Sequence, residues 1–466
     1  MSTRSWWLII SIGLGVMLNP LNSSMVAVAI PDLQHTFQLN YTAVSWIIFS
    51  FYIASAVTQP VMGRASDLFG RRKIFLAGLL VSLIVSLLAP FSLSFGWLIV
   101  FRILQSIGTS MMVAVGMAIV RIHITEKQAA ALSVLSIFLS GAAAIGPFVG
   151  GLLMYWWDWR AIFLMNIPVI LASTLLARQT IPVDKPSVQD MDQMTFGRWM
   201  KRIDAAGIFL FTTGLVALLI GTLSAISEDA LSGYSLVEGI AGVVILGGFV
   251  WHELRTDSPF IPLRTFARYP AMTWINMQFI VVNLIFYAIF FGLPSYLQIV
   301  RQISELHTGI LMLSLGLCSL LVSPLAGRWI DRAGPGPALL FSAVLMTFGS
   351  LGLVALGPHS GIIYICLTLA AFGISNGLNN VGMQAALFQN SPKEMIGVAS
   401  GLFSTSRYIG TILSSLLISI VAGRQFTFAG FRILGIVLTA AALLLVFMNW
   451  HQQKRQQHTV SPDHIS

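Results

Sequence analysis

Two copies of a charged, glycine-containing motif lie far apart in the chain and carry side chains suited to a conformational switch. Four residue types recur with one constant spacing, as Gly63, Arg64, Asp67 and Gly70 and again as Gly327, Arg328, Asp331 and Gly334. The glycines permit a tight turn, and an aspartate can accept hydrogen bonds from a helix N-terminus or a basic partner. Arg71 and Arg72, which follow the first copy, can pair with acids or lipid phosphates.

Arg102 and Gln105 form a second candidate site. Arg102 lies near the middle of an apolar run, where a charge costs about 2.5–3.5 kcal/mol in a membrane-spanning helix. We therefore expect it to face a polar cavity and to share a helix face with Gln105, one turn further on. A structural role, in which Arg102 satisfies backbone carbonyls, is the alternative. Arg407 lies near one end of its run, so a functional role and extension toward the membrane surface both stay open.

Acidic side chains are scarce in the apolar runs, whereas uncharged polar ones are frequent. None of the 17 acids lies clearly in mid-run, and Glu238 comes nearest to doing so. The uncharged groups are candidates for substrate contact or, alternatively, for hydrogen bonds between helices. They are Asn19, Asn22, Gln59, Asn276, Gln278, Asn283, Asn376, Asn379 and Asn380.

Sequence motifs of enzymes and ATP-driven pumps are missing or badly placed. Residues 373–377 match G-x-S-x-G, but that motif needs a strand-to-helix turn, and here it lies in an apolar helical run. The chain has no Walker A and no H-E-x-x-H sequence. Cys318 and Cys366 both lie in apolar runs, which gives a disulfide framework or a cysteine metal site no support. We expect neither enzymatic activity nor a bound metal or cofactor.

The elements that must position these residues are membrane-spanning helices. Of the 466 residues, 56% are hydrophobic and 9% charged, against about 25% charged in soluble proteins. A helix needs about 20 apolar residues to cross a bilayer, and the runs lack the alternation of barrel strands. We predict an all-α integral membrane protein with fourteen transmembrane helices, near residues 6–30, 43–62, 74–93, 96–119, 129–153, 161–178, 204–225, 233–251, 271–296, 308–326, 338–356, 361–387, 398–421 and 426–449.

The basic residues predict the orientation, and the repeated motif predicts the organisation. With the N-terminus in the cytoplasm, 20 of the 26 Lys and Arg residues fall on the cytoplasmic side, and both termini are cytoplasmic. The net charge of +9 then reflects orientation, and no loop interleaves basic and aromatic residues as nucleic-acid binding would require. The predicted parts are an N-terminal six-helix bundle (1–178), a linker with two inserted helices (179–265), a C-terminal six-helix bundle (266–450) and a cytoplasmic tail (451–466). Such repeated halves are typical of transporters, with the substrate site between them.

Three motifs resemble those of the major facilitator superfamily, and the fourteen spans resemble its drug:proton antiporter branch. The segment 63–73 resembles motif A, and 102–108 is similar to motif B, with Ser106 where glycine is usual. The third motif resembles the antiporter motif C and consists of Gly146, Pro147, Gly150 and Gly151, with Ala142 replacing an upstream glycine. Further matches at 159–168, 259–263 and 397–407 extend the resemblance over most of the chain.

The resemblance implies a transporter that works by alternating access. Asp67 would lock the two halves on the cytoplasmic side through the helix that starts near Ser400; a solvated loop that only sets topology is the alternative. Motif C would seal the pathway and favour export, with ordinary helix packing as its alternative. Arg102 would take part in proton transfer or in binding.

One departure from the family concerns coupling. Asn22 stands where the first span of the family commonly has an aspartate, and asparagine does not titrate. A buried carboxylate is the usual proton carrier and attracts cationic drugs, so coupling and cation preference are both open, and Arg102 would favour neutral or anionic substrates.

We expect proton-coupled efflux of small amphipathic compounds, as in multidrug antiporters, at a bacterial inner (plasma) membrane. The alternative is a facilitator or importer of a polar or anionic metabolite. The expected partners are a small-molecule substrate and the lipid bilayer, without nucleic acid. A monomer is the default, and the proton gradient is the energy source in place of any cofactor.

Overall fold

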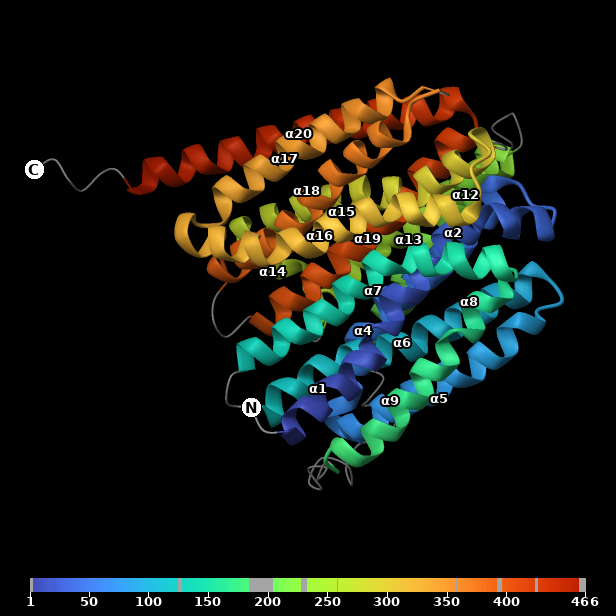
Figure 1. The fold of residues 1–466 in the computed structure, drawn as a ribbon. Helices are drawn as coiled ribbons and strands as arrows, with labels where there is room; N and C mark the ends of the chain where they lie inside the picture. Colours follow the sequence, from blue (N-terminus) through green and yellow to red (C-terminus); the bar gives the residue numbers. More distant parts are fainter. Residues whose placement is uncertain are drawn as a thin grey trace, which may run out of the picture. The chain divides into compact units, whose positions relative to one another are not determined.

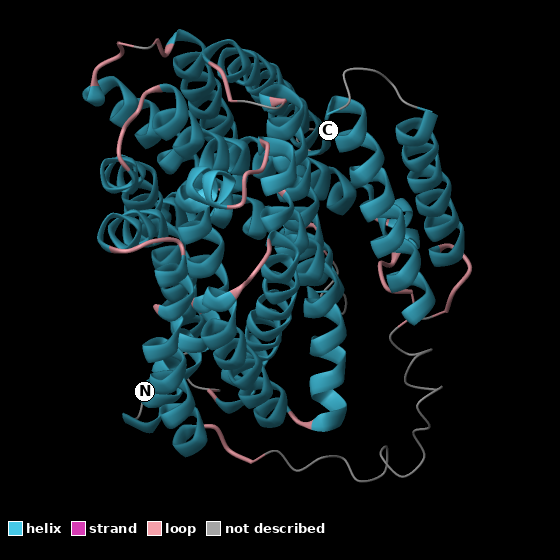
Figure 2. Cartoon of the chain, turned by 90° about the vertical axis from the view of Figure 1, so that its right-hand side faces the viewer, coloured by secondary structure: helices cyan, strands magenta, loops and turns pink. Residues whose placement is uncertain are grey.

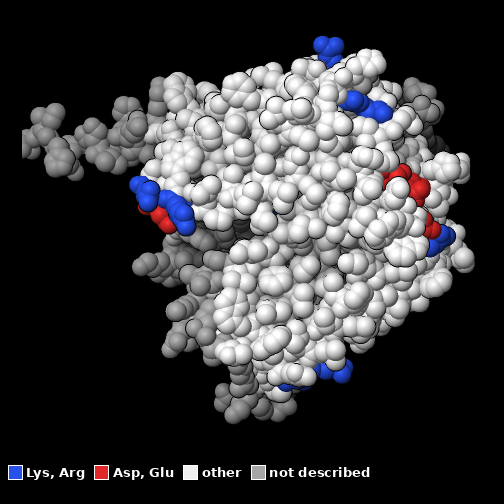
Figure 3. Space-filling model, viewed as in Figure 1, with Lys and Arg blue, Asp and Glu red and all other residues white. Residues whose placement is uncertain are grey.

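The structure is built from helices. The computed structural model describes residues 3–124, 128–183, 204–227, 233–257, 259–357, 359–391, 396–423 and 426–460, and no strand occurs in those ranges (Figures 1 and 2). Fourteen helical segments within them are long and apolar enough to cross a membrane. This confirms the predicted all-α membrane fold. Few of the side chains on the face drawn in Figure 3 are charged, as expected of a surface that meets lipid.

The chain divides into two compact units, Met1–Arg268 and Tyr269–Ser466. The helices of the first unit are α1 (Thr3–Val16), α2 (Leu18–Thr36), α3 (Tyr41–Val44), α4 (Trp46–Phe69), α5 (Arg71–Leu88), the 3₁₀ turn η1 (Ala89–Phe91), α6 (Phe95–His123), α7 (Gln128–Trp156), α8 (Arg160–Leu164), α9 (Asn166–Thr180), α12 (Ala205–Ser227), α13 (Gly233–Glu253) and α14 (Leu263–Arg268). Those of the second unit are α15 (Pro270–Ser295), the π-helix η2 (Tyr296–Val300), α16 (Glu305–Ala333), α17 (Pro335–Ala355), α18 (Ile362–Gln389), α19 (Ile396–Ala422) and α20 (Phe428–Val460).

Several helix boundaries depart from the predicted spans, and the second span is divided into α3 and α4 at Ser45. The first span consists of α1 and α2, which meet at Met17, and the sixth consists of α8 and α9, which meet at Met165. The last helix, α20, continues to Val460, so the first part of the predicted tail is helical. Residues 184–203 of the predicted linker and residues 461–466 of the tail lie outside the described ranges.

The two units repeat one pattern of helix packing. In the first unit α2 packs on α7, α6 packs on both α4 and α5, and α9 packs on α1 and α5. In the second unit α15 packs on α19, α18 packs on both α16 and α17, and α20 packs on α17 and α15. Because equivalent helices pair in the same way, the repeat seen in the charged motif extends to the packing of the six main helices of each unit.

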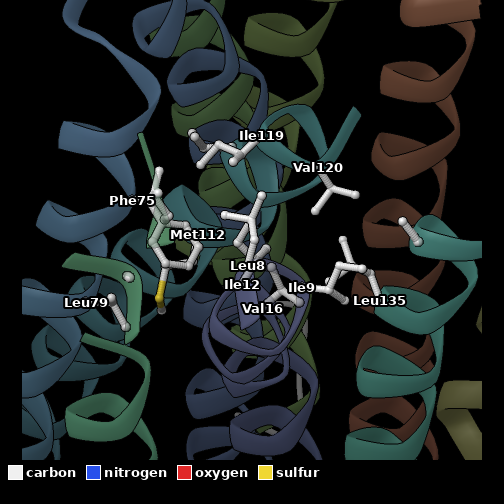
Figure 4. Packing of buried hydrophobic residues seen from close by; sticks show 14 of the residues in the cluster. Leu8, Ile9, Ile12, Val16, Phe75, Leu79, Met112, Ile119, Val120 and Leu135 are labelled. Carbon is white, nitrogen blue, oxygen red and sulfur yellow. The ribbon is translucent and has the colours of Figure 1, made fainter. Parts of the chain in front are cut away.

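A buried hydrophobic cluster holds α6 in place in the first unit. Leu8 and Ile12 of α1, Phe75 of α5, Met112 of α6 and Leu135 of α7 are among its residues (Figure 4). A fully buried aliphatic or aromatic side chain stabilises a soluble fold by about 1.5–3 kcal/mol, but against lipid the gain comes from close packing instead. The cluster therefore fixes the position of α6, the helix that carries Arg102.

The inserted helices α12 and α13 pack closely on each other. A Cβ atom on Gly221 would collide with backbone atoms of Gly239, and one on Gly242 with those of Leu218. Small residues thus let the two backbones meet, as is common between membrane helices. Outside this pair, α12 also contacts α4.

Candidate functional site

The strongest candidate site is a buried polar network centred on Arg102 of α6. The Arg102 side chain is buried, and its Nη1 donates to Oε1 of Gln105 at 2.7 Å, with a longer contact of 3.5 Å from Nε to the Ile47 carbonyl. The guanidinium also lies 4.3 Å from the centre of the Phe51 ring, a cation–π contact. The hydrogen bond between Arg102 and Gln105 agrees with the shared helix face expected from their spacing.

Asn22 of α2 links this pair to a third helix. Its Oδ1 accepts from Gln105 Nε2 at 2.9 Å and from Asn166 Nδ2 at 2.7 Å, while its Nδ2 donates to the Leu18 carbonyl at 2.7 Å. Asn22, Gln105 and Asn166 are all buried, so each bond forms away from water and leaving one unmade would be costly. The network therefore joins the first span, α6 and the start of α9 within the first unit.

The network contains one full charge and no carboxylate. In the described part of the chain, Arg102 forms no ion pair and its only side-chain hydrogen-bond partner is the neutral amide of Gln105. A guanidinium has five N–H donors, so these contacts leave donors on Nη2 for another acceptor. The network therefore keeps donor capacity for a hydrogen-bond acceptor or an anion.

Serine hydroxyls tie α6 to α4 next to this network. Ser106 Oγ donates to the Phe51 carbonyl at 2.6 Å and lies 2.7 Å from Ser55 Oγ, which also accepts from Ser110 Oγ at 3.1 Å. All three serines are buried. Ser106, which replaces the usual motif B glycine, therefore forms a hydrogen bond between α6 and α4. Its acceptor is the carbonyl of Phe51, whose ring contacts Arg102.

The motif C residues lie on α7 where it packs against α2. A Cβ atom on Gly146 would collide with Ser24, and one on Gly150 would lie 2.9 Å from the Met25 carbonyl oxygen. Pro147 lies inside the helix, and Gly151 is buried. The glycines thus permit the close approach that the sequence predicts, next to the helix that contains Asn22.

This close approach has a measurable consequence. Gly150→Ala is expected to destabilise the protein by about 1–3 kcal/mol, because the added methyl group meets the backbone of α2. Gly141→Ala, on the same helix, is the matched control, because no atom lies within 4 Å of the added carbon and alanine favours a helix. Thermal unfolding of the detergent-solubilised proteins compares them. Equal melting temperatures would contradict the packing of α7 on α2.

The motif A residues were expected to form a loop, but most of them lie in helices. Gly63 and Asp67 lie inside α4, and only Gly70 leaves the helix, with φ of 92°, before α5 begins at Arg71. In the second copy Gly327 and Asp331 lie inside α16, and Gly334 makes the turn with φ of 77°. Only the second glycine of each motif therefore forms a turn, since it alone adopts the left-handed conformation that favours glycine.

The side chains that would form the proposed lock are only partly described. The side chains of Asp67 and Ser400 lie outside the described parts of the structure. Arg72 donates from Nη2 to the Arg178 carbonyl at 2.7 Å, so this motif residue connects α5 to the end of α9. Arg71 is half-buried, and Asp331 is exposed.

Most of the remaining polar candidates form hydrogen bonds within their own unit. Asn19 Nδ2 donates to Thr109 Oγ1 at 3.0 Å, and Gln59 is half-buried. The bonds in the second unit are Asn276 to the Met272 carbonyl and Ser406, Gln278 to Gln452, Asn283 to the Phe279 carbonyl, Asn376 to Ser319 and Asn379 to Ser375. Asn380 is half-buried. The bonds of Asn276, Gln278 and Asn376 connect two helices and favour the helix-bridging alternative, whereas those of Asn283 and Asn379 stay within α15 and α18.

Arg407 and Asn166 are two further charged or polar side chains. Arg407 of α19 is exposed, with its guanidinium 5.7 Å from the centre of the Phe279 ring of α15. Asn166 was not among the predicted site residues, although it is a polar side chain in an apolar stretch. Its Oδ1 is buried without a hydrogen-bond partner, so it keeps acceptor capacity inside the network.

Comparisons with known proteins agree with the fold and with the family resemblance. The family model described as Major Facilitator Superfamily matches residues 12–415. The "Uncharacterized MFS-type transporter YwoD" of Bacillus subtilis (strain 168) is 43% identical over 427 residues, 92% of each chain. The "Tetracenomycin C resistance and export protein" of Streptomyces glaucescens is 28% identical over 423 residues, 90% of this chain and 76% of its own. The crystal structure of the human organic anion transporter MFSD10 (TETRAN) has a TM-score of 0.62 at 16% identity, covering 96% of this chain and all of its own. The chain is a multi-pass membrane transporter and belongs to the Major Facilitator Superfamily.

Proposed function

We propose that this transporter exports small amphipathic compounds from the cytoplasm across a bacterial plasma membrane, with the proton gradient as its energy source. The direction is supported by the motif C glycines and by the similarity to a relative whose name includes resistance and export. Alternating access between two repeated halves requires no ATP-binding motif, metal or other cofactor.

The buried guanidinium of Arg102 carries the proposal about the substrate. It is held by a neutral amide and an aromatic ring, and donors on Nη2 are left for another acceptor. A charge kept inside a membrane helix is costly, so its presence is best explained by a partner that arrives with the substrate. We therefore propose neutral or anionic substrates that carry a hydrogen-bond acceptor.

The two motifs have proposed roles in the transport cycle. Asp67 would form the cytoplasmic lock near Ser400, and the turns at Gly70 and Gly334 would let the helices on either side move as rigid pieces. The motif C face of α7 would seal the pathway against α2. The partially buried amides of Asn19, Gln59, Asn376 and Asn380 are proposed as the further substrate contacts.

Efflux from cells that lack their own pumps tests this proposal. A panel of cationic, neutral and anionic compounds is loaded, and export is followed with and without a protonophore. Export of the neutral and anionic members that the protonophore abolishes is the expected result. Asp67→Ala, expressed to the same level, should lose export if the lock is required. If the compounds instead equilibrate across the membrane equally with and without the protonophore, the protein is a facilitator.

A further inference from the structure

Two buried carboxylates lie at one end of the inserted helix pair, and their hydrogen-bond partners are not those of the Arg102 network. Asp204 immediately precedes α12, and Glu253 is the last residue of α13. Their side chains are 3% and 0% exposed. Burying two acids together is costly unless hydrogen bonds or a proton compensate for it, so this arrangement requires an explanation.

Both carboxylates hold the chain segment that leads from the inserted pair toward the second unit. Asp204 Oδ2 accepts from the Phe260 amide at 3.0 Å, and Glu253 Oε2 accepts from the next amide, Ile261, at 3.2 Å. The Phe260 ring also lies 6.0 Å from the ring of Phe211 on α12. We call residues 259–263 the linker segment. Its backbone is fixed by two successive hydrogen bonds to the two acids.

Asp204 Oδ2, which accepts from Phe260, and the second oxygen of Glu253, Oε1, both lie beside Gly207. A Cβ atom on Gly207 would collide with Asp204 Oδ2 and would lie 2.7 Å from Glu253 Oε1. Glu253 Oε1 is buried and has no hydrogen-bond donor. An ionised carboxylate only accepts hydrogen bonds, so the two groups cannot bond to each other unless one of them carries a proton. A proton on Glu253 would supply the missing hydrogen bond to Asp204.

The surroundings of Asp204 show which acid should hold the proton. Its carboxylate accepts from the Gly207 amide at 3.0 Å as well as from Phe260, and its Oδ1 lies 2.7 Å from His252 Nε2. Burial alone would raise the pKa of Asp204, but the hydrogen bonds from His252, Gly207 and Phe260 outweigh it and hold that pKa below its usual value. Asp204 therefore stays ionised, and Glu253 is the protonated partner.

The other charged groups nearby point elsewhere. Arg264 of α14 donates to the Leu254 carbonyl, and Arg255 stacks on the Trp251 ring at 4.3 Å. On α4, which contacts α12, the charged residues Arg64 and Asp67 have side chains outside the described structure. Among the described groups, His252 is thus the titratable side chain in contact with the pair.

We propose that Glu253 and Asp204 form a proton-binding site that latches the linker segment to the inserted helix pair. With the proton bound, Glu253 donates to Asp204 and both acids accept from the linker amides. Without it, two negative charges meet in a buried space, so the acids separate and the linker segment is released. The latch is closed at low pH and opens as the pH rises. The inserted pair would thereby sense cytoplasmic pH, given the predicted orientation of this end.

Hydrogen–deuterium exchange of the full-length protein in detergent tests the latch without any transport assay. Pro259 and Pro262 have no N–H, so exchange in the linker segment reports on Phe260, Ile261 and Leu263. After correction for intrinsic exchange, protection of the wild-type segment should fall at least about tenfold from mildly acidic to mildly alkaline pH. The proposal is wrong if the corrected protection of the wild-type segment does not change with pH.

Four variants separate the proton site from other causes. Glu253→Gln should keep the segment protected at both pH values, because the glutamine amide can donate to Asp204 and still accept from Ile261. Glu253→Ala should lose protection at both. Glu238→Gln, the same change elsewhere on α13, and His252→Gln, which removes the neighbouring imidazole, should both keep the wild-type pH dependence. The proposal is also refuted if Glu253→Gln follows the wild-type profile, or if His252→Gln abolishes it.

Discussion

Replacing Arg102 with methionine is expected to lower export of neutral and anionic compounds at least about tenfold while leaving the protein in the membrane. The change removes the only charge of the network and leaves Gln105 Oε1 without its donor. An unsatisfied buried acceptor costs about 1–3 kcal/mol, and about 1.4 kcal/mol corresponds to a factor of ten in an equilibrium. Membrane insertion should not suffer, because methionine in mid-helix is cheaper than arginine.

Arg102→Lys is the matched control for this prediction. Lysine keeps the positive charge but cannot reproduce the planar fork or its stacking on Phe51, so we expect partial export, greater than with methionine. The measurement is initial efflux rate per amount of protein in the membrane. If Arg102→Met exports the whole panel as the wild type does, the arginine has a structural role, and the substrate must be bound elsewhere.

The features that could be predicted from sequence are those that depend on neighbouring residues. Run length alone predicts the fourteen membrane helices, since a bilayer imposes a minimum length on each. The bond between Arg102 and Gln105 follows from their spacing within one helix turn. The close approach at Gly150 follows from the small-residue pattern of motif C, because only small side chains let two backbones meet.

The features that sequence reasoning missed depend on contacts between distant helices. Asn166 joins Asn22 across 144 positions of the chain, and the pairing of Asp204 with Glu253 depends on how α12 packs on α13. Membrane helices are apolar on nearly all sides, so their sequences carry little information about which face meets which neighbour. The motif A helix was missed for a different reason, because its charged residues suggested a loop although only Gly70 needs a turn conformation.

The sequence nevertheless carries a signal for the latch. Asp204 and Glu253 stand at the edges of two apolar runs, and the segment 259–263 that they hold was noted only as a family resemblance. Acids at the ends of membrane helices normally reach water, so their positions in the sequence do not indicate that these two form a buried pair. Their burial becomes evident only once the linker segment folds back over them.

Asn22 provides the sharpest test of how the network selects a substrate. Asn22→Asp keeps an oxygen that can accept from Gln105 and Asn166, so the fold should persist. It also places a negative charge next to the partner of Arg102 and restores the carboxylate that the first span of the family commonly has. We expect export of anionic compounds to fall at least about tenfold and cationic compounds to become substrates, because the carboxylate neutralises the site and attracts cations.

Two further substitutions distinguish charge from mere disruption. Asn22→Ala removes the acceptor altogether and leaves the Gln105 amide without its hydrogen-bond partner. This should lower both thermal stability and export of every compound. Asn449→Asp puts the same charge on a buried asparagine of α20 whose side chain donates to the Leu445 carbonyl of its own helix and is not among the proposed substrate contacts. It should leave the order of preference unchanged. If Asn22→Asp also leaves that order unchanged, the charge balance around Arg102 does not determine which compounds are carried, and selection must lie with the polar side chains outside this network.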